Sequence, residues 1–257
     1  MLDWNARNPF CAQCGQPTLS VNGGFKRTCP PNDSADLPAS ATATTAAKPT
    51  ERPSCATRTG ISNLSFPRTD PTVIMAVVSA DGKHILLGRG KRWPPYWYST
   101  LAGFLEPAES VEEAVRREVW EESGIVVGRV VIHSTQPWPY PANLMIGAVG
   151  QAVPASVAAQ TSVNRARKGG ATETGEAQEG EDALQKVDLG NDPELQDAKW
   201  FTFEEVTEAL RVGTSGLGED AGPDYVEGNL RLPPSTAIAN QLLTGVINGF
   251  AGGAVKL

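Results

Sequence analysis

The segment from Gly103 to Ile125 constrains this 257-residue chain more than any other. Ser110 and Glu113 have the spacing of a helix capping box, and the apolar residues that follow recur at helical intervals. Gly124 then has the position of a helix C-cap. The segment therefore predicts a helix between two loops.

Three carboxylates of this helix share one face. Glu118 and Glu122 are four residues apart and Glu121 is three from Glu118, which makes them neighbours on the helix surface. Like charges at this spacing repel each other, and a hard divalent cation such as Mg²⁺ relieves that repulsion. A lone acidic face is more often simply solvated, so the surrounding pattern has to decide between the two interpretations.

That pattern resembles the Nudix box: Gly, five residues, Glu, seven residues, Arg-Glu, an aliphatic residue, any residue, Glu-Glu, any residue, Gly and an aliphatic residue. The fixed positions are met here by Gly103, Glu109, Arg117, Glu118, Val119, Glu121, Glu122, Gly124 and Ile125. The resemblance implies the Nudix fold, an α/β (α+β) fold in which a mixed sheet forms an α/β/α sandwich with a loop–helix–loop catalytic motif.

In that family the glutamates matching Glu118, Glu121 and Glu122 bind Mg²⁺ or Mn²⁺ and support attack of water on phosphorus. The positions matching Gly103, Glu109, Arg117 and Gly124 hold the motif together. The substrates are nucleoside diphosphates linked to another group.

A second stretch narrows the substrate. Between Gln136 and Pro141, three prolines flank Trp138 and Tyr140, which predicts a stiff loop. Its rings either stack on a base or nicotinamide, or pack on the edge of the core. The stretch resembles the S-Q-P-W-P-F-P-x-S motif of the NADH pyrophosphatase subfamily, with Thr135 inserted, Tyr140 in place of Phe and Asn143 in place of Ser.

This second resemblance implies hydrolysis of NAD(H) to NMN(H) and AMP, and in some members removal of an NAD cap from RNA. It adds Glu194 to the catalytic and metal site, where Glu122 or Glu194 would orient or deprotonate the water. The substrate-binding positions carried over from the subfamily are Phe66, Ala102, Phe104, Gln136, Pro137, Trp138, Pro139, Tyr140, Pro141, Ala142, Asn143 and Ala239.

The four cysteines suggest a metal site rather than disulfides. Cys11 and Cys14 form a C-x-x-C knuckle, whereas 25 residues separate Cys29 from Cys55. The subfamily carries a four-cysteine zinc ribbon, which implies one structural Zn²⁺ per chain. Two alternatives stay open: three cysteines with another ligand, and an empty ribbon.

Composition divides the chain at about residue 66. Residues 1–66 are expected to form the zinc-ribbon-like segment, interrupted by a low-complexity insertion at about 30–54. Residues 67–257 are expected to form the Nudix domain, with a disordered acidic insertion at about 155–190. Within it we expect a hairpin of residues 73–78 and 84–88, a surface loop at 93–100, and a closing helix that begins near Ser235.

The net charge of −7 argues against non-specific binding to nucleic acid or anionic membranes. No signal peptide or membrane-spanning run is visible, so we expect a soluble intracellular protein. The C-terminal Val255-Lys256-Leu257 resembles the peroxisomal targeting signal Ser-Lys-Leu. The expected location of the protein is therefore the cytoplasm or the peroxisome. Subfamily members tend to dimerise and carry a further domain before the ribbon. This sequence begins ten residues before Cys11, so it is either a shortened form or an incomplete gene product, and without that domain a homodimer is doubtful.

Two rival functions remain. A Nudix hydrolase for ADP-ribose or a diadenosine polyphosphate is disfavoured by the retained stretch 136–141. A catalytically inactive zinc-ribbon binding module is disfavoured because an inactive scaffold need not keep mutually repelling glutamates.

Overall fold

The computed structural model describes residues 2–32, 51–59, 63–140, 142–160, 184–191 and 194–250. Within the chain, two compact units are distinguished, Met1–Thr69 and Asp70–Leu257. Pro141, the C-terminal residues 255–257 and the central parts of both predicted insertions, 33–50 and 161–183, lie outside the described residues. None of the described helices is both long enough and apolar enough to cross a bilayer.

The first unit is a small three-stranded antiparallel sheet. Its elements are α1 (Leu2–Arg7), β1 (Leu19–Val21), η1 (Asn22–Gly24), β2 (Lys26–Thr28), α2 (Ala56–Thr59) and β3 (Leu64–Ser65), and the strand order is β1-β2-β3. The buried cluster of this unit consists of Cys11, Cys29 and Cys55, with Cys14 packed against them. A unit of this size rarely stabilises itself by an apolar core alone, and small domains commonly add a structural metal or disulfides.

The second unit is built on a mixed six-stranded sheet. Its strands are β4 (Asp70–Val78), β5 (His84–Gly90), β6 (Leu101–Phe104), β7 (Val127–Trp138), β8 (Asn143–Ala152) and β9 (Leu195–Thr202), in the order β7-β8-β4-β5-β9. β4 runs parallel to β8, and the remaining pairs are antiparallel. β6 pairs with residues 72–75 of β4, whereas β5 pairs with residues 77–78.

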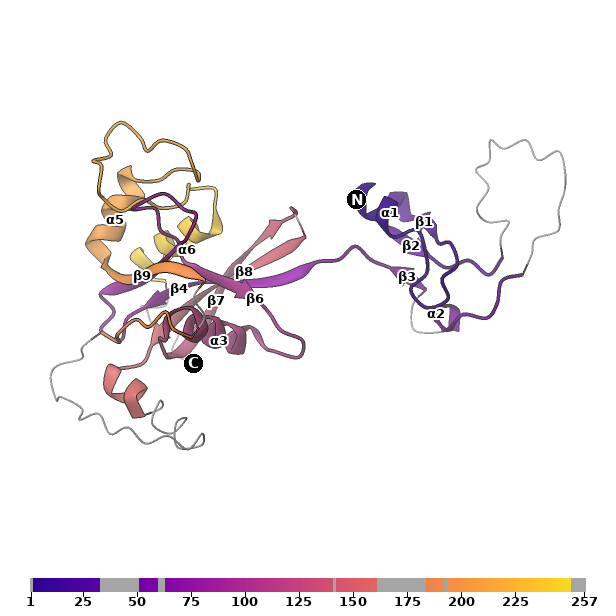
Figure 1. Cartoon of the computed structure of the whole chain (residues 1–257), viewed down its shortest axis with the longest axis horizontal. Coiled ribbons are helices and arrows are strands. Elements are labelled where there is room, and N and C mark those ends of the chain that lie inside the picture. Colours follow the sequence, from indigo (N-terminus) through magenta and orange to yellow (C-terminus); the bar gives the residue numbers. More distant parts are fainter. Residues whose placement is uncertain are drawn as a thin grey trace. The chain divides into compact units, whose positions relative to one another are not determined.

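Helices cover both faces of this sheet (Figure 1). α3 (Val111–Ser123) lies on one face, and α5 (Phe203–Val212) and α6 (Ile238–Ile247) lie on the other. The side chains of β4 alternate between the two cores: Val73 and Met75 pack with α3, while Ile74 and Ala76 pack with α5 and α6. The predicted α/β/α sandwich with a mixed sheet is therefore confirmed.

The predicted hairpin is present as β4 and β5, and Gly82 at its turn has a φ of 70°. The expectation of a surface loop at 93–100 is wrong about its depth, because Trp97 and Tyr98 are each only 5% exposed. The Trp97 indole donates to the carbonyl of Ser215 at 3.3 Å. The prolines correctly signal irregular backbone, but the rings of Trp97 and Tyr98 are buried, whereas Tyr96 is 49% exposed.

Ordered chain also reaches into the predicted acidic insertion from both sides. Residues 155–160 are helical. At the other end, Gln185 is 8% exposed and accepts from the Val126 amide at 2.8 Å, while its own amide donates to the Val153 carbonyl at 2.7 Å. Gln185 thus forms hydrogen bonds with backbone groups next to β7 and β8. The amino-acid composition of residues 155–190 does not predict these contacts.

Candidate active site and metal centre

Both ends of α3 are capped by its own neighbours. The Ser110 hydroxyl accepts from the Glu113 amide at 3.3 Å, and the Glu113 carboxylate accepts from the Ser110 amide at 2.9 Å. At the other end Gly124 adopts a left-handed conformation, with φ 72°, and its amide donates to the Trp120 carbonyl. The predicted helix limits are confirmed.

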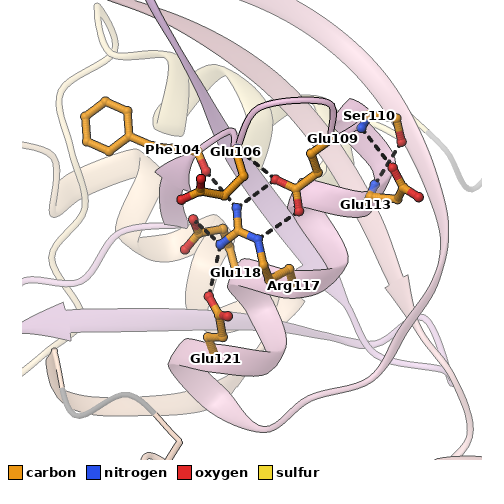
Figure 2. Close-up of polar contacts among 8 residues, drawn as sticks. All are labelled: Phe104, Glu106, Glu109, Ser110, Glu113, Arg117, Glu118 and Glu121. Atoms are coloured by element: carbon orange, nitrogen blue, oxygen red, sulfur yellow. Dashed lines mark hydrogen bonds and ion pairs between the residues drawn. The ribbon is translucent and has the colours of Figure 1, made fainter.

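Arg117 connects the parts of the motif (Figure 2). Its guanidinium donates to both oxygens of Glu109, each at 2.8 Å, and to the Phe104 carbonyl at 2.8 Å. The same group donates to Glu118 at 2.8 Å and to Glu121 at 3.0 Å. The sequence predicts that Arg117 and Glu109 hold the motif, but it does not predict that Arg117 also holds two of the candidate metal ligands.

These contacts divide the carboxylates electrostatically. The hydrogen bonds from Arg117 hold the pKa of Glu109 below its usual range. Burial raises the pKa of Glu118, whose side chain is only 14% exposed, and Arg117 only partly opposes this shift. Glu118 is thus a desolvated carboxylate beside other acids, an environment in which a bound cation would stabilise the ionised form.

Gly103 has a steric reason to be glycine. A Cβ atom at this position would lie 1.9 Å from the carboxyl carbon of Glu118, far inside van der Waals contact. β6 therefore approaches α3 closely enough that the Glu118 carboxylate occupies the space of the missing side chain.

A cavity of about 850 Å³ opens beside this helix. It is lined by Glu118, Glu121 and Glu122 from α3 and by Glu194, which directly precedes β9. The predicted substrate-binding residues that line the same cavity are Ala102, Phe104, Trp138, Asn143 and Ala239. Residues separated by more than 130 positions in the sequence are thus brought to one concave surface.

The other predicted substrate-binding residues do not line this cavity. Phe66 belongs to the first unit, where the Lys26 ammonium lies 4.8 Å from its ring centroid. Tyr140 is 88% exposed at the β7–β8 turn, whereas Trp138 is 49% exposed. Pro137, Pro139 and Ala142 belong to the same hairpin, and Pro141 is not described. The stretch is therefore not one stiff loop, because β7 continues through Trp138 before the chain turns.

Gln136 has a positioning role that the sequence does not indicate. The nitrogen of its side-chain carboxamide donates to the Thr236 carbonyl at 2.8 Å, and the oxygen of the same group accepts from the Ile238 backbone amide at 2.9 Å. These two bonds fix the start of α6 against β7, and Ala239 follows directly in α6. Gln136 thus shapes the cavity through α6 rather than by lining it.

Sequence reasoning also missed several lining residues. Trp93 and Trp97, which form an edge-to-face pair with centroids 4.9 Å apart, line the cavity together with Leu217 and Met145. The aromatic run 93–98 is the one sequence signal that could have indicated them. The prolines of this run, however, predict a surface loop.

The four cysteines form a second candidate metal centre, in the first unit. Their sulfur atoms all lie within 4.8 Å of one another, with 3.8 Å between Cys11 and Cys55 and 3.6 Å between Cys14 and Cys29. Tetrahedral Zn²⁺ with Zn–S bonds of about 2.3 Å requires sulfur separations of about 3.8 Å, so the donor set fits this ion. The structure therefore brings Cys55 to the other three despite the long separation in sequence.

Neighbouring side chains support this cluster. The Thr57 hydroxyl lies 3.1 Å from the sulfur of Cys55, and this hydrogen bond lowers the pKa of that thiol to about 6. Arg58 donates to the Cys29 sulfur at 3.6 Å. Asn63 pairs with both the amide and the carbonyl of Cys29, at 3.2 and 2.8 Å. Within the part of the chain that the structure describes, the glutamates of α3 and Glu194 do not form a comparably tight cluster.

Family comparison agrees with both sites. Residues 68–216 match the model of the NUDIX domain, and residues 6–35 match the NADH pyrophosphatase zinc ribbon domain. The chain belongs to the Nudix family and carries a zinc ribbon of the NADH pyrophosphatase type, as the two sequence resemblances indicated. The ribbon match includes Cys11, Cys14 and Cys29 but ends before Cys55.

Individual relatives narrow the family further. The chain is 37% identical over 243 residues to the NAD-capped RNA hydrolase NUDT12 of Macaca fascicularis, a match that covers 95% of this chain and 39% of that protein. It is 35% identical over 252 residues to the NAD-capped RNA hydrolase NPY1 of Saccharomyces cerevisiae, covering 97% and 53%. It is 30% identical to the mouse mitochondrial NAD(P)H pyrophosphatase NUDT13, covering 95% and 51%. The chain thus spans about half, or less, of the length of these relatives.

Proposed function

We propose that this chain hydrolyses the diphosphate bond of NAD(H), giving NMN(H) and AMP, and that the same reaction removes an NAD cap from RNA. The observation that carries the proposal is the shared cavity. Its lining brings Trp138, Phe104 and Ala239 together with the four candidate metal ligands, Glu118, Glu121, Glu122 and Glu194. A diphosphate at the glutamates would leave the aromatic part of the cavity for a base or a nicotinamide ring. The names of the relatives support the same substrate class.

We further propose that Glu118, Glu121, Glu122 and Glu194 hold Mg²⁺ or Mn²⁺. Carboxylate oxygens are the ligands that both ions prefer, and the desolvated Glu118 favours a cation. The ion supplies charge neutralisation for the diphosphate and its leaving oxygen. In the first unit, Cys11, Cys14, Cys29 and Cys55 hold one Zn²⁺ with a structural role.

The protein residues then have distinct tasks. Arg117 fixes Glu118 and Glu121 relative to the loop before the helix. Glu122, which is 8% exposed, or Glu194 accepts the proton of the attacking water. The exposed ring of Trp138 stacks on a planar group of the substrate. We propose residues 1–66 as the zinc-ribbon segment and 67–257 as the catalytic domain.

The test is product analysis by chromatography. Purified protein with Mg²⁺ or Mn²⁺ is incubated with NADH, NAD, NAD-capped RNA, ADP-ribose and diadenosine polyphosphates. We expect AMP and NMNH to appear fastest from NADH. The Glu122→Gln variant should be slower by about a thousandfold, because a carboxylate of the reacting site is lost. Glu112→Gln is the matched control, since it removes the same charge from the same helix outside the cavity.

Other outcomes have clear meanings. Faster cleavage of ADP-ribose or a diadenosine polyphosphate would keep the Nudix chemistry but overturn the proposed substrate. A near-normal rate in Glu122→Gln would remove that residue from the reacting site. If no substrate is cleaved under any of these conditions, the inactive binding module becomes the better interpretation.

A further inference from the structure

A second cavity, of about 410 Å³, adjoins the catalytic one. The two cavities share five lining residues, Glu122, Glu194, Trp93, Thr100 and Ala102. They therefore meet at two of the carboxylates that we propose as metal ligands. A substrate whose diphosphate lies at these carboxylates has two directions in which its remaining groups can extend.

The cavities differ in charge. The described lining of the larger cavity contains five glutamates, Glu106 among them, and neither lysine nor arginine. The lining of the smaller cavity contains Lys91 and Arg92, two exposed residues that directly follow β5. Since phosphates are repelled by carboxylates and attracted by such cations, an additional phosphate is better accommodated in the smaller cavity.

Thr100 provides an independent indication of a ligand at the junction. This residue lines both cavities and is only 5% exposed. Its hydroxyl oxygen has no hydrogen-bond partner among the described residues. Buried hydroxyls are nearly always hydrogen-bonded, because leaving one unpaired carries the desolvation penalty without compensation. A phosphate oxygen at the junction would accept from this hydroxyl.

We propose that Lys91, Arg92 and Thr100 form a subsite for a phosphate that lies beyond the cleaved diphosphate on the same nucleotide. The inference rests on the proposed function, which places the diphosphate at Glu122 and Glu194. Two substrates carry such a phosphate: an RNA chain that continues from an NAD cap, and a dinucleotide with an extra phosphate on its ribose, NADPH. The exposed position of both basic residues favours the RNA chain, because a chain can continue from there into solvent.

The test compares three substrates in the double variant Lys91→Gln/Arg92→Gln. The value of kcat/KM for NADH should stay within about twofold, whereas that for a NAD-capped RNA oligonucleotide should fall about tenfold at low salt. The slope of log kcat/KM against log salt for the capped RNA should become shallower by about 0.7, since the neutralisation of one phosphate of a single strand is lost. The matched control is Lys83→Gln/Arg129→Gln, which removes the same charge at exposed positions; Lys83 directly precedes β5, at the strand end opposite Lys91.

Selective loss on capped RNA supports the subsite for an RNA chain, and selective loss on NADPH supports it for a ribose phosphate. Equal loss on all three substrates, no loss on any, or the same loss in the control variant overturns the inference. If the wild-type protein cleaves none of the substrates, the proposed function fails separately. The subsite is then judged by fluorescence anisotropy with a labelled 5′-phosphorylated RNA: about tenfold weaker binding to the double variant supports it, and equal binding overturns it.

Discussion

The two candidate metal centres are built in opposite ways. All fixed positions of the catalytic motif lie within residues 103–125, and each carboxylate bonded to Arg117 is within eight residues of it. In the cysteine cluster, the closely spaced sulfur atoms of Cys11 and Cys55 belong to residues 44 positions apart. Local spacing therefore predicts the part of the first centre that α3 contributes, whereas Glu194 and the whole cysteine cluster depend on how distant chain segments are joined.

The joining is done by backbone and arginine contacts on both sides of residues 33–50. Asn32 and Glu51 form an antiparallel bridge, and the Arg52 amide donates to the Pro31 carbonyl at 3.0 Å. The Arg52 side chain is 6% exposed and donates to the carbonyl of Pro17. These contacts return the chain to the ribbon before Cys55, so the length of the intervening segment does not separate the ligands.

The largest expected effect is that of Cys55→Ser. If all four thiolates hold zinc, replacing one by a hard hydroxyl should abolish stoichiometric zinc binding and destabilise the first unit by several kcal/mol, because metal affinity is part of its folding free energy. Zinc content by mass spectrometry and limited proteolysis of residues 1–69 measure this. Thr57→Val, which removes only the hydroxyl beside Cys55, should retain zinc. Full zinc content in Cys55→Ser would instead favour three cysteines with another ligand.

The next largest effect is expected in the catalytic motif, from Gly103→Ala. The new methyl group would collide with the Glu118 carboxylate, and moving this group by about 1 Å should lower kcat about a hundredfold. Gly222→Ala is the control, since a Cβ there meets only the Val212 carbonyl, at 3.9 Å. Rates and thermal unfolding should be measured together. A Gly103→Ala variant with an unchanged rate would show that the position of Glu118 does not limit catalysis.

The sequence predicts features whose cause is local. The caps of α3, the β4–β5 hairpin and the sandwich all follow from short-range patterns, as does the row of glutamates on one helix face. The features it misses depend on tertiary contacts. The indole of the buried Trp97 donates to a carbonyl more than a hundred positions away in the sequence. The side chain of Gln136 forms a hydrogen bond with the start of α6, at a similar separation in the sequence. No local pattern contains those partners.

A smaller effect, confined to the catalytic unit, is expected from Glu109→Gln. Arg117 lowers the pKa of Glu109 in the folded state below the unfolded value of about 4.3, so the ionised carboxylate stabilises the fold at higher pH. This stability is lost as the pH falls through the lowered folded-state pKa. The free energy of unfolding of the wild type should therefore exceed that of the variant by about 1–2 kcal/mol at pH 7 in urea unfolding, and this difference should shrink as the pH falls below the unfolded value.

Zinc content should be the same in both proteins, because Glu109 belongs to the second unit. Glu112→Gln is the control for a charge removed from the same region without a bond to Arg117. A difference between wild type and Glu109→Gln that does not change with pH would contradict the ionic origin of the stabilisation.

The smallest expected effect tests whether the long connection in the ribbon matters at all. Residues 33–50 are replaced by a two-residue turn, which the bridge between Asn32 and Glu51 can accommodate. Zinc content should be unchanged, and the first unit should become more stable by about 1 kcal/mol, because closure of a shorter loop costs less entropy. Chelator-induced unfolding compares the two proteins.

The same replacement combined with Arg52→Ala should lose this gain, because the buried Arg52 side chain no longer fixes the returning chain to Pro17. Loss of zinc in the shortened chain alone would show that residues 33–50 contribute to the metal centre beyond joining its ends.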